Sequence, residues 1–213
     1  MATNRTKTKT MVIEEDYDGA IDYATETFFS EKIFVYPTDT VYGFGGNIFS
    51  NKAVKRITEI KGREASKGFI LLLSSIESLS RYAEIKDVSQ LSFLRRIFPN
   101  PISVVMKLTM RGEEELGVKS AAFRIPDNKF CLDLCERIKL PLISTSVNRS
   151  GEAPLNSFSE IKKEFESEVD VIFYTRAEEE GSVSTLIDLT GDKPVLLREG
   201  KIKFPEIIKN ILD

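Results

Sequence analysis

The chain has 213 residues, of which 41% are hydrophobic and 30% charged, and its formal net charge is −3. These values are ordinary for a globular protein with a sizeable core, and they exclude an overall basic surface for bulk nucleic-acid binding. The sequence has no histidine, which excludes Ser–His and Cys–His catalysis, and its two cysteines alone are too few ligands for zinc.

The N-terminal segment is polar and basic, and no apolar run follows it. We therefore expect residues 1–12 to be a flexible terminus rather than a signal peptide. No stretch approaches the roughly 20 apolar residues of a membrane span, so a cytoplasmic protein is expected. We expect one domain over residues 13–205 and a C-terminal tail over residues 206–213.

Apolar residues at helical spacing mark six segments. Asn51 is placed to cap the second of them, and Cys131 and Cys135 lie four residues apart on one face of the fifth. The predicted helices cover residues 16–30, 51–61, 76–82, 88–98, 129–138 and 158–165.

Short apolar runs bounded by turn residues predict the strands. These lie within residues 32–36, 69–75, 99–109, 120–126, 140–151, 169–175, 184–190 and 194–200. The last two runs flank the turn GDKP and are expected to pair. Several strands follow one another without an intervening helix. This favours a single α/β or α+β domain with a mixed sheet over a doubly wound fold.

Four polar clusters each follow a predicted strand or helix. In VYPTDTVYGFGG, residues 35–46, glycines would let a ligand approach the backbone and threonine hydroxyls could bind its polar groups. The alternative is a tight turn capped by threonine. KGREASKG, residues 61–68, is expected to form an exposed loop, in which Lys61, Arg63 and Lys67 suit phosphate oxygens. The alternative is a solvated basic loop that binds no ligand.

The third cluster is STSVNRSG, residues 144–151, whose hydroxyls and amide could bind a ligand or simply begin a helix. The fourth places Ser184 and Thr185 at the start of one strand and Arg198 at the end of the next, which alone indicates a hairpin. No segment fits a P-loop or completes a dinucleotide fingerprint. A nucleotide would have to bind through scattered cations and hydroxyls.

In this order, the four clusters together with PNPISVVMKL and AAFRIP resemble the YrdC-like domain family, the threonylcarbamoyl-AMP synthases. The similarity runs from about residue 17 to residue 200. It implies a twisted mixed sheet flanked by helices, with a large concave electropositive cleft. It also implies that L-threonine, bicarbonate and ATP, with Mg²⁺, give threonylcarbamoyl-AMP and pyrophosphate.

The resemblance also implies partners and residue roles. The adenylate would pass to a separate tRNA-modifying threonylcarbamoyl-transferase complex. The tRNA itself is a further implied partner, through a weak contact. Lys61 and Arg63 would be catalytic. The implied ATP-binding residues are Lys61, Arg63, Lys67, Ser120, Asn148, Asn156 and Arg198. The implied threonine-binding residues are Thr38, Leu72, Arg124, Ser146 and Ser184. No protein ligand to a metal is implied.

The chain departs from the family pattern at several positions. Leu72 stands near the place of a histidine that helps to hold threonine in many members, and Glu64 replaces a proline. The chain also resembles the catalytic domain alone, without the C-terminal domain of longer members. Two alternatives remain: a paralogue similar to the YciO branch with weak or altered activity, and a non-catalytic nucleotide- or RNA-binding module.

Overall fold

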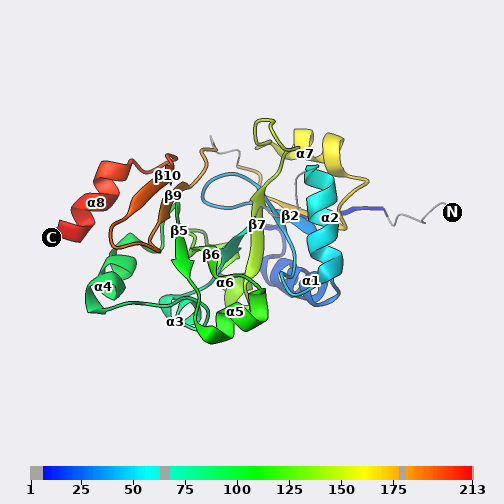
Figure 1. Cartoon of the computed structure of the whole chain (residues 1–213). Helices are drawn as coiled ribbons and strands as arrows, with labels where there is room; N and C mark the ends of the chain where they lie inside the picture. The colour runs from blue at the N-terminus through cyan, green and yellow to red at the C-terminus, as the bar shows by residue number, and fades with distance from the viewer. Residues whose placement is uncertain (1–6, 63–67, 178–180, 213) are drawn as a thin grey trace.

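The computed structural model describes residues 7–62, 68–177 and 181–212, with side chains to residue 209, and Figure 1 shows its arrangement. The helices are α1 (Tyr17–Phe29), α2 (Asn51–Lys61), α3 (Ile76–Leu79), α4 (Val88–Ile97), α5 (Met110–Leu116), α6 (Lys129–Ile138), α7 (Phe158–Phe165) and α8 (Phe204–Leu212). The strands are β1 (Lys9–Val12), β2 (Phe34–Tyr36), β3 (Gly43–Gly45), β4 (Ile70–Leu72), β5 (Ile102–Lys107), β6 (Ser120–Arg124), β7 (Leu142–Ser146), β8 (Val171–Tyr174), β9 (Thr185–Asp188) and β10 (Val195–Arg198).

Local sequence explains where the predicted helices begin. The side chain of the residue before each helix accepts a hydrogen bond from a backbone N–H of the first turn, as in a standard N-cap. These caps are Asp16, Ser50, Ser75, Asp87, Asn128 and Ser157. All six predicted helices are therefore confirmed, but the cap of α2 is Ser50 and not the expected Asn51.

The strands form one mixed sheet in the order β1-β8-β2-β3-β7-β4-β6-β5-β9-β10. Parallel pairs such as β4 with β6 and β5 with β9 alternate with antiparallel pairs such as β4 with β7 and β5 with β6. The expected hairpin of β9 and β10 is present. The mixed-sheet prediction is confirmed.

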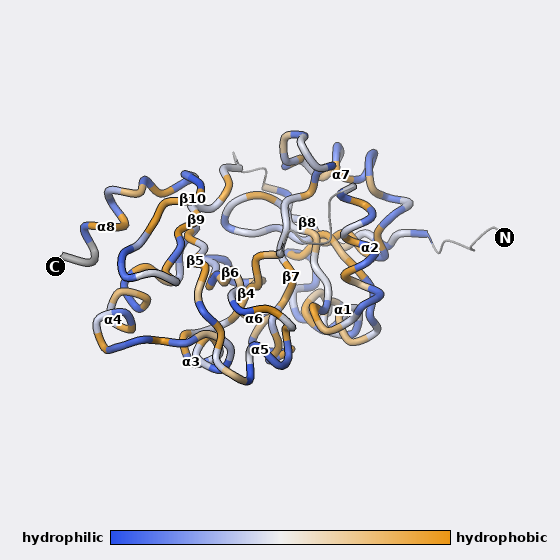
Figure 2. The backbone as a smooth tube through the Cα atoms, in the orientation of Figure 1, coloured by the Kyte–Doolittle hydropathy of each residue, from blue (hydrophilic) through white to orange (hydrophobic). Residues whose placement is uncertain are grey.

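Alternate residues of the strands enter two apolar clusters, because successive side chains of a strand point to opposite faces. Leu71 and Ile143 belong to the cluster that contains residues of α2, α4 and α7. Leu72 and Leu142 belong to the cluster that contains residues of α1 and α6. Hydropathy follows this arrangement, with apolar strands such as β4 and β7 at the centre and polar stretches outside (Figure 2).

Four elements were not predicted. Residues 9–12 form β1, which pairs in parallel with β8, so this part of the expected flexible terminus belongs to the sheet. The glycine-rich segment contains β3, and residues 110–116 form α5. Residues 206–212 of the expected tail lie within α8, which contacts α4. None of the described helices combines the length and apolar content needed to cross a membrane.

Candidate functional site

A cleft of about 210 Å³ opens on the sheet face that α1 and α6 cover at one end. Its walls come from the ends of several strands, so residues far apart in sequence meet there. Four of the predicted site residues line it: Arg124, Ser146, Ser184 and Arg198. Thr40, Tyr42, Gly43, Ser144 and Leu186 line it as well.

Arg124, at the end of β6, is the most buried cation of the cleft, with 4% of its surface exposed. Its Nη2 donates to Oδ1 of Asp39, and its Nη1 donates to Oγ1 of Thr40 at 2.9 Å. Its Nε is buried and has no hydrogen-bond partner among the described residues. The family resemblance implied that this guanidinium binds a substrate carboxylate. In the structure it is already paired with a carboxylate of the chain, that of Asp39.

Arg198 approaches the cleft from β10. Its Nη2 donates to the backbone oxygen of Ser184 at 2.9 Å and to Ser184 Oγ at 3.1 Å. Arg198 keeps an exposed surface, but partial burial at the cleft, and then the positive charge of Arg124, lower its pKa. Two guanidinium groups therefore repel each other across the cleft, and an anion bound between them would relieve that repulsion.

Lys61 lies elsewhere than the sequence predicted. It is the last residue of α2 and 4% exposed, so the expectation that it lies in an exposed loop is wrong. Its Nζ donates to the backbone oxygen of Ser146 at 2.6 Å, and to the backbone oxygen and Oδ1 of Asn148 at 3.2 and 2.7 Å. The ammonium group thus ties α2 to the residues that follow β7.

Asn148 is the centre of this polar network. Its Oδ1 also accepts from Ser146 Oγ at 2.7 Å, and its Nδ2 donates to the backbone oxygen of Glu152 at 2.6 Å. Only 9% of Asn148 is exposed. The network fixes the turn after β7 at the mouth of the cleft.

Thr38 and Asn156 lie beside the cleft, in a side pocket of about 150 Å³ that shares Thr40 and Tyr42 with it. Thr38 Oγ1 is 2.9 Å from Thr40 Oγ1 and donates to the backbone oxygen of Val41 at 2.8 Å. Asn156 Oδ1 accepts from the backbone N–H of Tyr42 at 3.3 Å. Both side chains therefore also hold the segment that follows β2.

The other predicted residues are less close. Ser120 is exposed at the outer end of β6, paired in register with Lys107. Leu72 is fully buried in the cluster that contains residues of α1 and α6, and it does not line the cleft. Leu72 therefore has no exposed surface with which to make the expected contact with threonine. Arg63 and Lys67 lie outside the described residues.

The glycines after β2 serve packing more than ligand access, contrary to expectation. A Cβ on Gly45 would lie 2.6 Å from Phe34 Cε2 and 2.8 Å from Tyr36 Cε1. A Cβ on Gly46 would lie 3.3 Å from Ala53 and Ile57. Of these three glycines, Gly43 alone lines the cleft.

Sequence reasoning missed Asp39 and Thr40 as partners of Arg124, and Ser103 as the partner of Ser184. The signal for the first two was the TDT segment itself, two hydroxyls flanking an acid, from which only Thr38 was selected. Ser103 gave no such signal, because its neighbours in the sequence are those of an ordinary buried strand. Its hydroxyl lies 2.9 Å from Ser184 Oγ.

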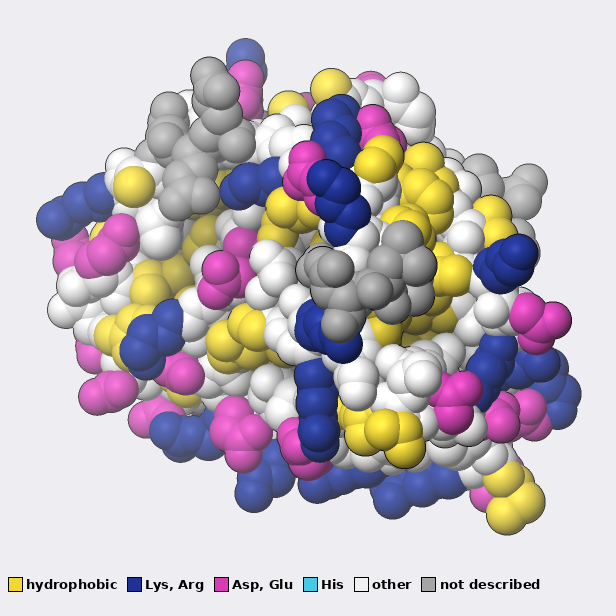
Figure 3. Space-filling view, turned by 90° about the vertical axis from the view of Figure 1, so that its left-hand side faces the viewer, with side chains coloured by type: hydrophobic (Ala, Val, Ile, Leu, Met, Phe, Trp, Pro, Cys, Tyr) yellow, Lys and Arg dark blue, Asp and Glu magenta, His cyan; other side chains and the backbone are white. Residues whose placement is uncertain are grey.

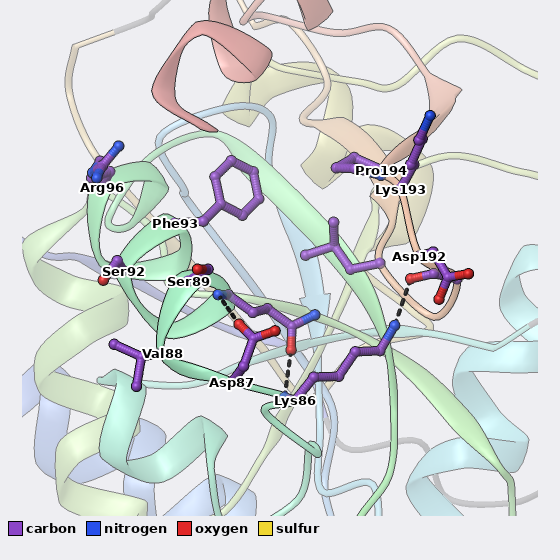
Figure 4. Close-up of a pocket in the computed structure, with 13 residues that line it drawn as sticks. Lys86, Asp87, Val88, Ser89, Ser92, Phe93, Arg96, Asp192, Lys193 and Pro194 are labelled. Atoms are coloured by element: carbon purple, nitrogen blue, oxygen red, sulfur yellow. Dashed lines mark hydrogen bonds between the residues drawn. The ribbon is translucent and has the colours of Figure 1, made fainter. Parts of the chain in front are cut away.

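A second cavity, of about 350 Å³, lies between α4 and the turn that joins β9 to β10 (Figure 4). Ser89 and Phe93 of α4 face Lys193 and Pro194 of the turn across it. Lys86 Nζ bridges to the same turn by donating to the backbone oxygens of Thr190 and Gly191 at 3.2 and 2.5 Å. Among the residues that the structure describes, no predicted site residue lines this cavity.

The side of the molecule that carries α4, α8 and β10 shows acidic and basic side chains mixed together (Figure 3). No single sign of charge dominates this face, in keeping with the net charge of −3. In the described part of the chain, no group of three or more His, Cys, Asp or Glu is placed to hold a metal ion. The described side chains that line the cleft offer guanidinium and hydroxyl groups.

Comparison with known proteins gives consistent matches. The Sua5/YciO/YrdC family model, described as "Telomere recombination", matches residues 26–200. The "Threonylcarbamoyl-AMP synthase" of Pyrococcus abyssi (strain GE5 / Orsay) is 34% identical over 183 residues, which are 84% of this chain and 54% of that protein. The chain thus spans about half the length of this curated relative.

Two solved structures are similar along most of the chain. P. abyssi Sua5 complexed with L-threonine superimposes with a TM-score of 0.83 at 31% identity, covering 96% of this chain and 60% of that one. E. coli YciO gives a TM-score of 0.77 at 28% identity, covering 87% of this chain and 91% of that one.

Proposed function

This chain belongs to the Sua5/YciO/YrdC family, and we propose that its cleft makes threonylcarbamoyl-AMP and pyrophosphate from L-threonine, bicarbonate and ATP. The threonine amine and bicarbonate condense to N-carboxythreonine with loss of water. An oxygen of the new N-carboxylate group attacks the α-phosphorus of ATP. The bond from that phosphorus to the oxygen that bridges to the β-phosphate breaks, and pyrophosphate leaves. The protein is then a nucleotidyltransferase.

The observation that carries this proposal is the meeting of two guanidinium groups with hydroxyls from three strand regions in one cleft. Both reactants are anions, so their approach requires neutralised charge and fixed orientation. Arg124 and Arg198 supply positive charge. Ser146 and Ser184 supply hydrogen bonds to oxygen atoms, and no step of this reaction needs histidine.

We assign roles from the family resemblance, with support for those residues that line the cleft. Arg124 binds the threonine carboxylate, with Ser146 and Ser184 as hydroxyl partners. Arg198 and Asn148 contact the nucleotide. Lys61 holds the turn after β7 in place, as its three oxygen partners favour.

Further roles rest on the family resemblance and on neighbouring positions. We propose that Arg63 and Lys67 bind ATP phosphates and that Arg63 is catalytic. Thr38 would contact threonine from the side pocket. Asn156, from the same pocket, and Ser120, at the outer end of β6, would contact the nucleotide.

Mg²⁺ enters this scheme as part of the ATP complex. Hard cations prefer oxygen ligands, and Mg²⁺ commonly keeps water and phosphate oxygens in its coordination shell. The described residues hold no acidic cluster that would fix the ion by itself, so we propose that ATP phosphates and water supply its ligands. When bound, the ion screens phosphate charge.

The product constrains the partner. Threonylcarbamoyl-AMP is a mixed anhydride that transfers its threonylcarbamoyl group to a nucleophile. We propose that a separate tRNA-modifying transferase complex in the cytoplasm consumes it, with at most weak contact between this chain and tRNA. The net charge of −3 is consistent with that weak contact.

A second candidate is a YciO-like paralogue with weak or altered activity. The match along 91% of E. coli YciO favours it. The network that joins Lys61, Ser146 and Asn148 favours the synthase, because it builds an ordered turn at the cleft mouth.

Pyrophosphate release from ATP and bicarbonate tests the proposal. It should require L-threonine, and L-serine should support much less. Arg198→Met should abolish release in a folded protein, whereas Arg81→Met, which removes an exposed arginine, should leave it intact. ATP binding without threonine-dependent release would favour the paralogue instead.

A further inference from the structure

Ser103 is a polar residue at a fully buried position on β5. In the sheet, β5 lies between β6, which ends at Arg124, and β9, which follows Ser184. Ser103 pairs in register with Leu186, which lines the cleft. Since residues paired across neighbouring strands share a face, the Ser103 side chain lies on the cleft side of the sheet, where it is fully buried and does not itself line the cleft.

Three groups converge on Ser184. Ser103 Oγ lies 2.9 Å from Ser184 Oγ. Arg198 Nη2 donates to the same oxygen at 3.1 Å, and Arg198 Nη2 and Nε donate to the Ser184 backbone oxygen at 2.9 and 3.2 Å. Ser184 itself is 3% exposed and lines the cleft.

Counting protons decides what Ser184 can offer a ligand. A hydroxyl has one proton to donate and two lone pairs to accept with, and an arginine only donates. If Ser103 donates to Ser184, Arg198 and Ser103 together fill both lone pairs. The Ser184 proton then has no acceptor among these groups and is available to an oxygen atom in the cleft. If Ser184 donates to Ser103 instead, it can only accept from a ligand.

We propose that Ser103 is a positioning residue that donates to Ser184 and so makes Ser184 a hydrogen-bond donor to the substrate. This inference rests on the proposed synthase function, in which the substrate presents carboxylate or carbamate oxygens, which are acceptors. Ser103 does not touch substrate. From a buried position beside the cleft, it sets the direction of the Ser184 hydroxyl, which does touch substrate.

The kinetic test separates this role from that of an ordinary satisfied serine in the core. Ser103→Ala should raise KM for threonine about fivefold to tenfold, the effect of one ordinary hydrogen bond. Its kcat and its KM for ATP should stay within about twofold. Ser103→Thr keeps the hydroxyl and should restore KM. Thr27→Val is the matched control, because Thr27 is 3% exposed and its hydroxyl donates to Tyr23 within α1.

An unchanged KM for threonine in Ser103→Ala would overturn the inference. An equal rise in the KM for threonine in Thr27→Val would overturn it too, because the rise would then reflect a general loss of stability and not the contact with Ser184. A wild-type protein without threonine-dependent activity would instead count against the proposed function.

A measurement that needs no enzyme activity distinguishes failure of the Ser103 inference from failure of the proposed synthase function. The Arg198 Nη2–H resonance in NMR spectra, assigned with Arg198→Lys, reports the bond to Ser184 Oγ. It should shift in Ser103→Ala and stay in place in Thr27→Val. An unshifted resonance would show that Ser103 does not position Ser184, whatever the enzyme does.

Discussion

The ammonium group of Lys61 donates to Asn148 Oδ1 at 2.7 Å, which joins the end of α2 to the turn after β7. The two residues are 87 positions apart in the chain. Lys61 is thus part of the framework that shapes the cleft mouth.

Removing this ammonium group should therefore reduce both stability and activity. Lys61→Met leaves buried oxygens of Ser146 and Asn148 without their donor, which costs about 1–3 kcal/mol in the free energy of unfolding. A displaced turn should lower kcat/KM by about 100-fold. Urea denaturation and pyrophosphate release measure the two effects. Lys55→Met, on the same helix with a side chain 76% exposed, should change neither. Full stability in Lys61→Met would contradict the structural role.

The buried pair of Asp39 and Arg124 leads to a second prediction. Their side chains are 8% and 4% exposed, so Asp39→Ala leaves a buried guanidinium without its carboxylate. The free energy of unfolding should fall by about 3–5 kcal/mol. Glu59→Ala, which breaks an exposed pair with Lys55, should cost no more than about 0.5 kcal/mol. Added sulfate should raise the melting temperature of Asp39→Ala more than that of wild type, and an equal response would argue against anion binding between Arg124 and Arg198.

The close approach of β3 to the aromatic rings of β2 predicts a packing defect. In Gly45→Ala the new methyl group would overlap Phe34 and Tyr36, and the free energy of unfolding should fall by about 1–3 kcal/mol. Gly191→Ala is the control, because its Cβ would have its nearest neighbour at 4.0 Å. Equal urea midpoints for the two variants would show that β3 moves aside at no cost.

The two thiols of α6 predict sensitivity to alkali. Burial raises the pKa of Cys131 and of Cys135 above the ordinary value of 9.0. In the unfolded chain these thiols ionise near that value, while in the folded chain they stay protonated. Above it the folded state binds more protons, so stability falls as pH rises, by up to about 1.4 kcal/mol per pH unit for each thiol.

Urea midpoints under reducing conditions from about pH 7 to about pH 10.5 should show this decline. Replacing both cysteines by alanine should flatten the curve. Buried Tyr36, whose pKa is also raised well above its ordinary value by burial, leaves a residual slope at the highest pH. An identical slope in the double variant would mean that other groups cause the alkaline loss.

Elements that arise from local interactions could be predicted from the sequence. The bounds of α6 and α7 match the predicted ranges, because apolar spacing and the caps Asn128 and Ser157 act within a few residues of each helix start. The turn GDKP between two apolar runs likewise predicted the hairpin of β9 and β10. The mixed sheet followed from the order of these elements.

Only the tertiary structure decided what each polar side chain does. The short strand β1 forms because its backbone pairs with the edge of β8. Lys61 is buried because the end of α2 lies beside the end of β7. The placement of Leu72 in the core, the pairing of Asp39 with Arg124 and the contact of Ser103 with Ser184 depend in the same way on strand register. A hydrogen bond or ion pair between distant segments forms only when the distance between its atoms is set to within a few tenths of an ångström. Local spacing in a sequence does not encode those distances.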